Sequence, residues 1–261
     1  MSATSGSRIL GTGTPAQPAS WLAKTLALTA HELRLAMRRG ESLLVTFVIP
    51  VGVLLVGSAL NLGGTGRAVD QMLPGSMSLA IIAAAMVSLS IATAFERSYG
   101  VLKRLGGSPA GTSALVASKT AAVIVVEAVQ VVLLVAIAIG IGWSAGPAAS
   151  AALTVVGLLR GTVAFAGLGL LMAGTLRAEA TLALANLLFL VSLVVGGVIM
   201  PLDKLPSTVA AASSVLPPAA LTKVLAIGLG GSMGDATEPL IVLAVWAVLL
   251  AGLAARKFRW D

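Results

Sequence analysis

The chain has 261 residues, of which 57% are hydrophobic and only 10% are charged, and its mean hydropathy is +1.02. Soluble domains carry roughly 25% charged residues, so this composition excludes a soluble globular protein. A disordered chain is excluded too, because disorder requires low hydrophobicity. A hydrocarbon core about 30 Å thick needs about 20 apolar residues per helix, and six such spans with their loops would use the whole length.

The net charge is +7, which in a membrane protein indicates an excess of Lys and Arg in cytoplasmic segments rather than a nucleic-acid partner. The absence of cysteine excludes disulfides, thiolate metal ligands and thiol nucleophiles. His31 is the single histidine, which removes most histidine-based zinc and triad chemistry. No catalytic residue and no metal site is therefore expected.

The N-terminal region divides into two predicted parts. Residues 1–20 are rich in Ser, Gly, Thr and Pro and contain no apolar run, which predicts a disordered cytoplasmic tail rather than a signal peptide. Residues 21–39 predict an amphipathic helix that lies in the interface plane without spanning, with Trp21 as its anchor. The apolar residues that share one face of this helix are Leu22, Leu26, Leu33 and Met37.

Residues 40–261 are predicted to form an all-α transmembrane domain of six helices. The six apolar segments lie at 42–60, 73–95, 115–141, 149–176, 180–201 and 238–255. With both termini in the cytoplasm, 13 of the 17 basic residues fall in cytoplasmic segments. The outer loops hold only Arg67, Lys204 and Lys223, so the positive-inside rule favours this orientation.

The loop at 202–237, between the fifth and sixth spans, has an unusual composition. It follows Pro201 and contains Pro206 and Pro217, yet the stretches between its prolines are apolar enough to be half buried. This pattern predicts short re-entrant helices that dip into the outer leaflet, where non-helical backbone must pack against protein.

A charged segment lies between the second and third spans. Glu96, Arg97, Lys103 and Arg104 flank apolar residues such as Leu102 and Leu105, and Gly106, Gly107 and Pro109 then stop any helix. One interpretation is a short amphipathic helix on the cytoplasmic side that offers charges and apolar knobs to a partner. The other is an ordinary basic cytoplasmic loop.

Polar residues inside the spans are the remaining candidates. Glu127 and Arg160 lie at similar predicted depths in neighbouring spans, which favours a structural ion pair and leaves a gating or substrate-path role as the alternative. Lys119, near the inner boundary, is expected to snorkel. Asn186 either bonds across helices or faces the pathway. Gly157 and Gly161 form a G-x-x-x-G pair, for which internal packing is favoured over a dimer seam.

Three segments resemble those of a known family, and the third is the region of Pro217 with the apolar helix that follows it and ends in Gly230 and Gly231. Residues 96–109 read E-R-S-Y-G-V-L-K-R-L-G-G-S-P, and residues 196–206 read G-G-V-I-M-P-L-D-K-L-P. They resemble, in order and spacing, the corresponding segments of ABC-2 type exporter permeases, such as the daunorubicin-resistance type. Gly196 stands where Ser is usual. The resemblance gives Pro201, Leu205, Pro206 and Pro217 a structural role in the outer loop.

The resemblance implies that a separate ATP-binding subunit, holding ATP and Mg, drives transport, because the chain has no G-x-x-x-x-G-K-[ST] phosphate loop. This chain would bind no cofactor, would pair with a second permease chain, and would lie in the plasma membrane of a bacterium. The residues implied in docking the ATP-binding subunit are Glu96, Arg97, Leu102, Lys103, Arg104 and Leu105.

Other classes fit less well. A membrane-embedded enzyme needs clustered carboxylates or histidines, and this chain has one histidine and no D-x-x-D cluster. An ATP-independent channel or secondary transporter stays as the alternative, although the sequence shows no internal repeat. The apolar, aromatic-poor spans favour a hydrophobic drug-like or lipid substrate.

Overall fold

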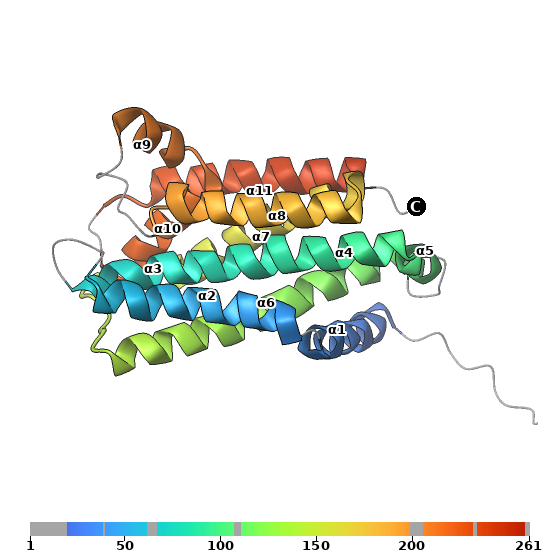
Figure 1. The fold of residues 1–261 in the computed structure, drawn as a ribbon, viewed down its shortest axis with the longest axis horizontal. Helices are drawn as coiled ribbons and strands as arrows, with labels where there is room; N and C mark the ends of the chain where they lie inside the picture. The colour runs from blue at the N-terminus through green and yellow to red at the C-terminus, as the bar shows by residue number, and fades with distance from the viewer. Residues whose placement is uncertain are drawn as a thin grey trace, which may run out of the picture.

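The computed structural model describes residues 20–38, 40–61, 67–106, 111–198, 206–231 and 234–258, and all regular structure in these ranges is helical (Figure 1). The predicted tail at 1–20 lies outside the described residues except for Ser20. The elements in chain order are α1 (Trp21–Arg38), α2 (Gly40–Ala59), α3 (Ala68–Ile81), the π-helix η1 (Ile82–Ser88), α4 (Leu89–Ser98), α5 (Val101–Gly106), α6 (Gly111–Gly140), α7 (Ala151–Thr175), α8 (Ala178–Val195), α9 (Ser207–Ser214), α10 (Pro217–Gly228) and α11 (Thr237–Lys257).

Five helices in the described part of the chain are long and apolar enough to cross a membrane. They are α3–η1–α4 as one unit, α6 from Ser113, α7, α8 and α11. The first predicted span corresponds to α2, whose apolar part Thr46–Ala59 is shorter. The predicted all-α membrane fold is therefore confirmed. The fifth span ends at Val195, six residues before its predicted end, because the chain turns at Gly197 with a φ of +67°.

The long helix α3–η1–α4 is the most buried of the candidate spans. Its middle turns are π-helical, and the Leu89 amide donates to the Ala84 carbonyl five residues earlier. Here α7 comes close, since a Cβ added at Gly169 would lie 3.0 Å from the carbonyl oxygens of Ala85 and Met86. The sequence analysis did not predict this π-helical segment.

Other glycines of α7 let α10 and α11 approach closely. A Cβ at Gly157 or Gly161 would meet the α10 side chains of Val224 and Leu221, at 2.6 and 2.9 Å. At Gly167 it would lie 2.7 Å from the Ala251 nitrogen of α11. The G-x-x-x-G pair therefore packs inside the chain, as predicted.

The segment between the last two spans contains the predicted pair of short helices. The axes of α9 and α10 differ by 81°, and α10 is packed against α7, α3 and α11. Pro217 is the first residue of α10 and is buried, while Pro206 is exposed at the N-cap of α9. Pro201 and Leu205 lie outside the described residues.

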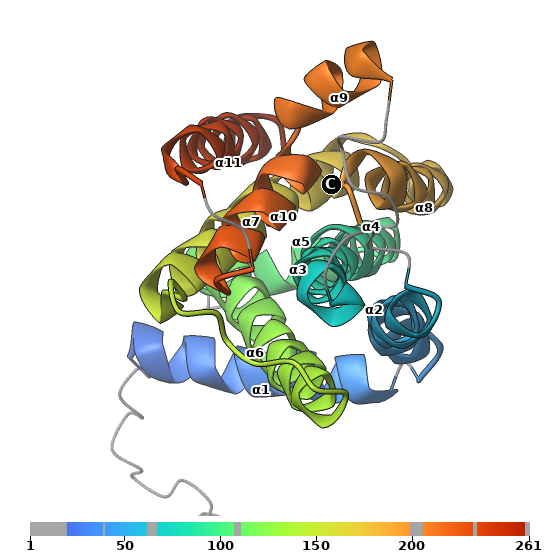
Figure 2. The same ribbon diagram turned by 90° about the vertical axis from the view of Figure 1, so that its left-hand side faces the viewer.

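Two ends of the bundle can be distinguished in Figure 1. The α9 end holds α9 and α10, and the opposite α5 end holds α5 and α1. Figure 2 shows α1 lying across the other helices. Thr25 and Thr29 of α1 are buried, and α1 packs on α6, whereas Leu22, Leu26 and Met37 remain exposed. The helix predicted at 21–39 is therefore present, and three of the four residues of its predicted apolar face point away from the bundle, while Leu33 is half-buried.

Candidate functional site

The connection from α4 to α5 forms a sharp turn at the α5 end. α4 ends at Ser98, Gly100 takes a φ of +71° that favours glycine, and α5 begins at Val101. The predicted short helix after the second span is therefore present.

Burial divides the predicted docking residues into two groups. Lys103 and Arg104 are exposed, and so are Val101 and Tyr99, the latter at 72%. Leu102, expected at the surface as an apolar knob, is instead 1% exposed because α5 packs back onto α4 and α6. The side chain of Leu105 lies outside the described part of the chain.

Glu96, also expected at the surface, is buried in a charged triad. The Lys119 Nζ donates to Glu96 Oε2 at 2.5 Å and to Glu32 Oε1 at 2.8 Å. Lys119 is only 4% exposed, so the expected snorkelling to the surface is wrong. A buried ammonium needs such partners, because an unpaired buried charge is costly. The triad joins three elements: α1, α4 and α6.

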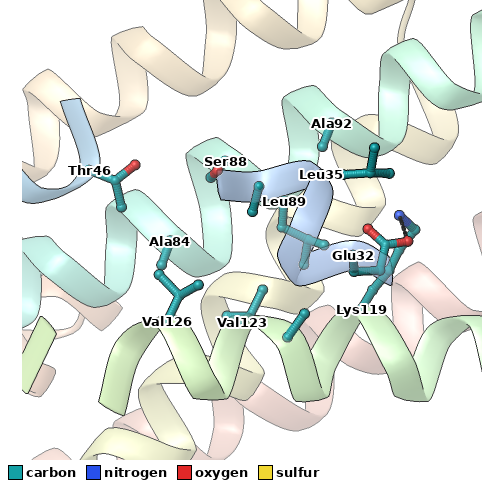
Figure 3. Close-up of a pocket in the computed structure, with 12 residues that line it drawn as sticks. Glu32, Leu35, Thr46, Ala84, Ser88, Leu89, Ala92, Lys119, Val123 and Val126 are labelled. Atoms are coloured by element: carbon teal, nitrogen blue, oxygen red, sulfur yellow. Dashed lines mark hydrogen bonds and ion pairs between the residues drawn. The ribbon is translucent and has the colours of Figure 1, made fainter. Parts of the chain in front are cut away.

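Lys119 and Glu32 also line a small cavity of about 70 Å³ between α1, η1–α4 and α6, where Figure 3 shows their charged groups meeting. The remaining walls are mostly small or apolar side chains, including Ala84, Leu89 and Val123. One feature of the sequence could have indicated the triad: Lys119 lies in an otherwise apolar helix, where a lysine requires an acidic partner or a route to water.

Arg97 makes a second connection from the same turn. Its Nη2 donates to the Leu176 carbonyl, in the short link between α7 and α8. Arg97 is half-buried, so it stabilises the packing of α4 on its neighbours. The α4–α5 turn is therefore tied by Glu96 to α6 and α1, and by Arg97 to the α7–α8 link.

The polar residues within the spans have partners that the sequence did not predict. Glu127 Oε2 accepts from the Thr162 hydroxyl at 2.6 Å. Arg160 Nη1 donates to the Leu240 carbonyl at 3.0 Å. In the described part of the chain no ion pair joins Glu127 to Arg160, so that prediction is wrong. Residues two positions apart on a helix point in different directions around its axis. On α7, Thr162 therefore faces α6 while Arg160 faces α11.

Two intramembrane amides behave differently. Asn186 is exposed, and its Nδ2 donates to the Leu182 carbonyl of its own helix at 2.9 Å rather than across helices. Gln130, which the sequence analysis did not single out, is buried and donates from Nε2 to the Thr46 carbonyl at 2.8 Å. This bond fixes α6 against α2.

Within the described ranges, no group of three or more His, Asp or Glu side chains is placed to hold a metal ion. The fold and its apolar spans define a multi-pass membrane protein. Residues 23–229 match the family described as ABC-2 type transporter, so the chain belongs to that family. A comparison with curated proteins finds no matching relative. The membrane domains of this family have no ATPase site of their own and pair with ATP-binding subunits.

Proposed function

We propose that this chain is the permease subunit of an ATP-driven exporter in the plasma membrane of a bacterium. Membership of the ABC-2 type family is the observation that carries the proposal. The chain would form the translocation pathway together with a second permease chain. A separate subunit would bind ATP and Mg and hydrolyse the ATP.

We place the α5 end, and with it both termini, in the cytoplasm. The exposed basic residues Lys103 and Arg104 belong to α5. Arg177 follows Leu176, whose carbonyl binds Arg97, and Arg256 and Lys257 precede Phe258, which lines one cavity together with Leu102 of α5. Such an excess of basic residues on one side is typical of cytoplasmic segments. The α9 end would face outward, with α10 packed among the spans as a re-entrant helix.

The proposed docking surface consists of Tyr99, Val101, Lys103 and Arg104. Lys103 and Arg104 supply two positive charges, and Tyr99, at the end of α4, and Val101 supply two large exposed side chains. The buried Leu102 anchors α5 against the bundle. A displacement of α5 by the docked subunit would be transmitted to α6 and α1 through the triad. It would also be transmitted to the α7–α8 link through Arg97. Buried groups that are tightly paired move together, which is the property required to transmit closure of the ATP-binding subunits.

The proposed substrate is a hydrophobic drug-like molecule or a lipid. The spans are apolar, and their charged side chains Glu127 and Arg160 are engaged within the chain. A polar polymer would need many free hydrogen-bonding groups along its path. An apolar substrate needs few.

The proposal is tested by co-expressing the chain with its ATP-binding subunit and measuring co-purification and ATP-dependent export in vesicles. We expect Arg104→Glu to weaken co-purification and Lys103→Glu/Arg104→Glu to abolish it, with membrane insertion unchanged. The matched control is Lys223→Glu, an exposed lysine near the α9 end. Unaltered co-purification and export in the double variant would reject this docking surface. Purification without any ATPase partner would reject the exporter itself.

A further inference from the structure

A second and larger cavity lies at the α5 end, away from the triad's small cavity. Its volume is about 340 Å³, within the size range of about 300–1,000 Å³ of small-molecule sites. Side chains of α4, α5, α6, α7 and α11 line it, and most are apolar. Apolar cavities of even about 150 Å³ stay free of water and bind apolar ligands.

The cavity opens toward the lipid-facing surface. Val116 and Val163 on its wall are 39% and 45% exposed, whereas Ala166, Leu102 and Ala254 are buried at its floor. In a bilayer, the fluid that meets such an opening is hydrocarbon. An acyl chain can enter sideways, between α6 and α7, without any opening of the bundle.

The cavity contains one unsatisfied polar group. Three polar side chains line it: Lys119, Thr120 and Thr93. Lys119 is paired in the triad, and the Thr120 hydroxyl donates to the Val116 carbonyl. Among the described residues, the hydroxyl of Thr93, which is 1% exposed, has no hydrogen-bond partner. A buried hydroxyl without a partner is costly, so the occupant should carry an acceptor, such as an ester carbonyl.

Two basic residues at the edge of the cavity favour a ligand with an anionic headgroup. Arg256 and Lys257 are exposed at the end of α11, directly after the lining residues Ala254 and Ala255, and no ion pair engages them among the described residues. At about 1.5 Å per residue, Ala251 lies about 9 Å below Lys257, which is the depth of a lipid's upper acyl chain below its phosphate. Clusters of basic residues at a membrane surface attract anionic lipids.

We propose that this cavity binds an acyl chain of an anionic phospholipid, with Arg256 and Lys257 at the phosphate and Thr93 donating to the ester. This site does not depend on the proposed export function, because each of its elements is a property of this chain alone. The bound chain would lie between α6 and the last turns of α11, which are already packed against α7.

The test uses the full chain in nanodiscs that contain phosphatidylglycerol with a photoreactive diazirine on one acyl chain, and mass spectrometry of the labelled peptides. We expect labelling to concentrate on residues 115–120, 163–170 and 251–255. Val163→Trp should fill the opening and reduce this labelling at least fivefold. The matched control Val156→Trp changes an exposed valine of the same helix that does not line the cavity, and should leave it unchanged.

Further variants make the result decisive. If Val163→Trp is poorly produced, Ala255→Trp at the exposed rim serves the same purpose. Arg256→Gln/Lys257→Gln should lower the preference for phosphatidylglycerol over phosphatidylcholine probes about tenfold. Thr93→Val should weaken labelling with both probes. Labelling spread evenly over the lipid-facing helices, or labelling of the cavity residues that Val163→Trp and Ala255→Trp leave unchanged, would overturn the proposal.

Discussion

The ammonium of Lys119 and the carboxylate of Glu96 lie 2.5 Å apart in the protein interior, although they come from different helices. Glu32 completes the group from α1, so one lysine holds the interfacial helix and the end of α4 against α6. The two residues are 4% and 8% exposed, and their charges are therefore screened little by solvent.

Removal of the central charge should destabilise the protein strongly. We expect Lys119→Met to cost about 3–5 kcal/mol, because the buried carboxylate of Glu96 and the partly buried carboxylate of Glu32 both lose their bond to this ammonium. The measurement is the unfolding midpoint in detergent. Lys103→Met, which removes an exposed lysine, should change it little. The triple variant Glu32→Gln/Glu96→Gln/Lys119→Met should recover part of the loss, and no recovery would show that the effect is not one of charge pairing.

The polar residues of α6 and α7 should respond according to their observed partners. Exchanging the charges, Glu127→Arg/Arg160→Glu, should give a lower yield of monodisperse protein than either single neutralisation. The reason is that a carboxylate at position 160 would face the Leu240 carbonyl, acceptor against acceptor. Glu127→Gln should be tolerated, since an amide oxygen can still accept from Thr162. A swap that restores the yield would mean that the two residues pair after all.

Two glycines on touching helices should differ in their response to a methyl group. Gly167→Ala should lower the melting temperature, because its Cβ would lie 2.7 Å from the Ala251 backbone nitrogen and would force α7 and α11 apart. Gly252→Ala should not, since no atom outside its own turns of α11 lies within 4 Å of its added Cβ. Alanine there should even favour the helix by up to about 1 kcal/mol. Equal effects at both sites would contradict the close α7–α11 contact.

Asp235, just before α11, provides a prediction on pH. Hydrogen bonds from the Thr237 hydroxyl, at 2.6 Å, and from the Thr237 amide, at 2.9 Å, lower the pKa of its carboxyl below the ordinary value of 3.8. A lowered folded-state pKa means that the stabilisation is present above pH 3.8 and is lost as the pH falls through the lowered value. Thr237→Val should raise the pKa, as measured by carbon NMR of labelled aspartate. A pKa that does not move would show that the hydroxyl does not bond in solution.

The sequence predicted the helices better than it predicted the interaction partners of the buried polar side chains. A membrane span is predicted from a run of about 20 apolar residues, which is a local property of the sequence. The prolines around α9 and α10 likewise marked a break in the chain. The partner of a buried charge depends instead on how each helix is rotated, which is decided by packing across long sequence distances. For this reason the Glu32–Lys119 pair was missed and a Glu127–Arg160 pair was wrongly expected.

The π-helical segment η1 has a consequence for how the long helix tolerates changes in its length. A π hydrogen bond spans five residues instead of four, so η1 takes up extra chain without turning the parts on either side of it. An added residue in a regular α-helix would turn everything after it by about 100°, and Glu96 would leave Lys119. A one-residue deletion within η1 should therefore leave Glu96 facing its partner, while an inserted alanine in α4 should not. The π-helical turn thus preserves the rotation of α4 relative to α6, and with it the direction in which α5 projects from the bundle.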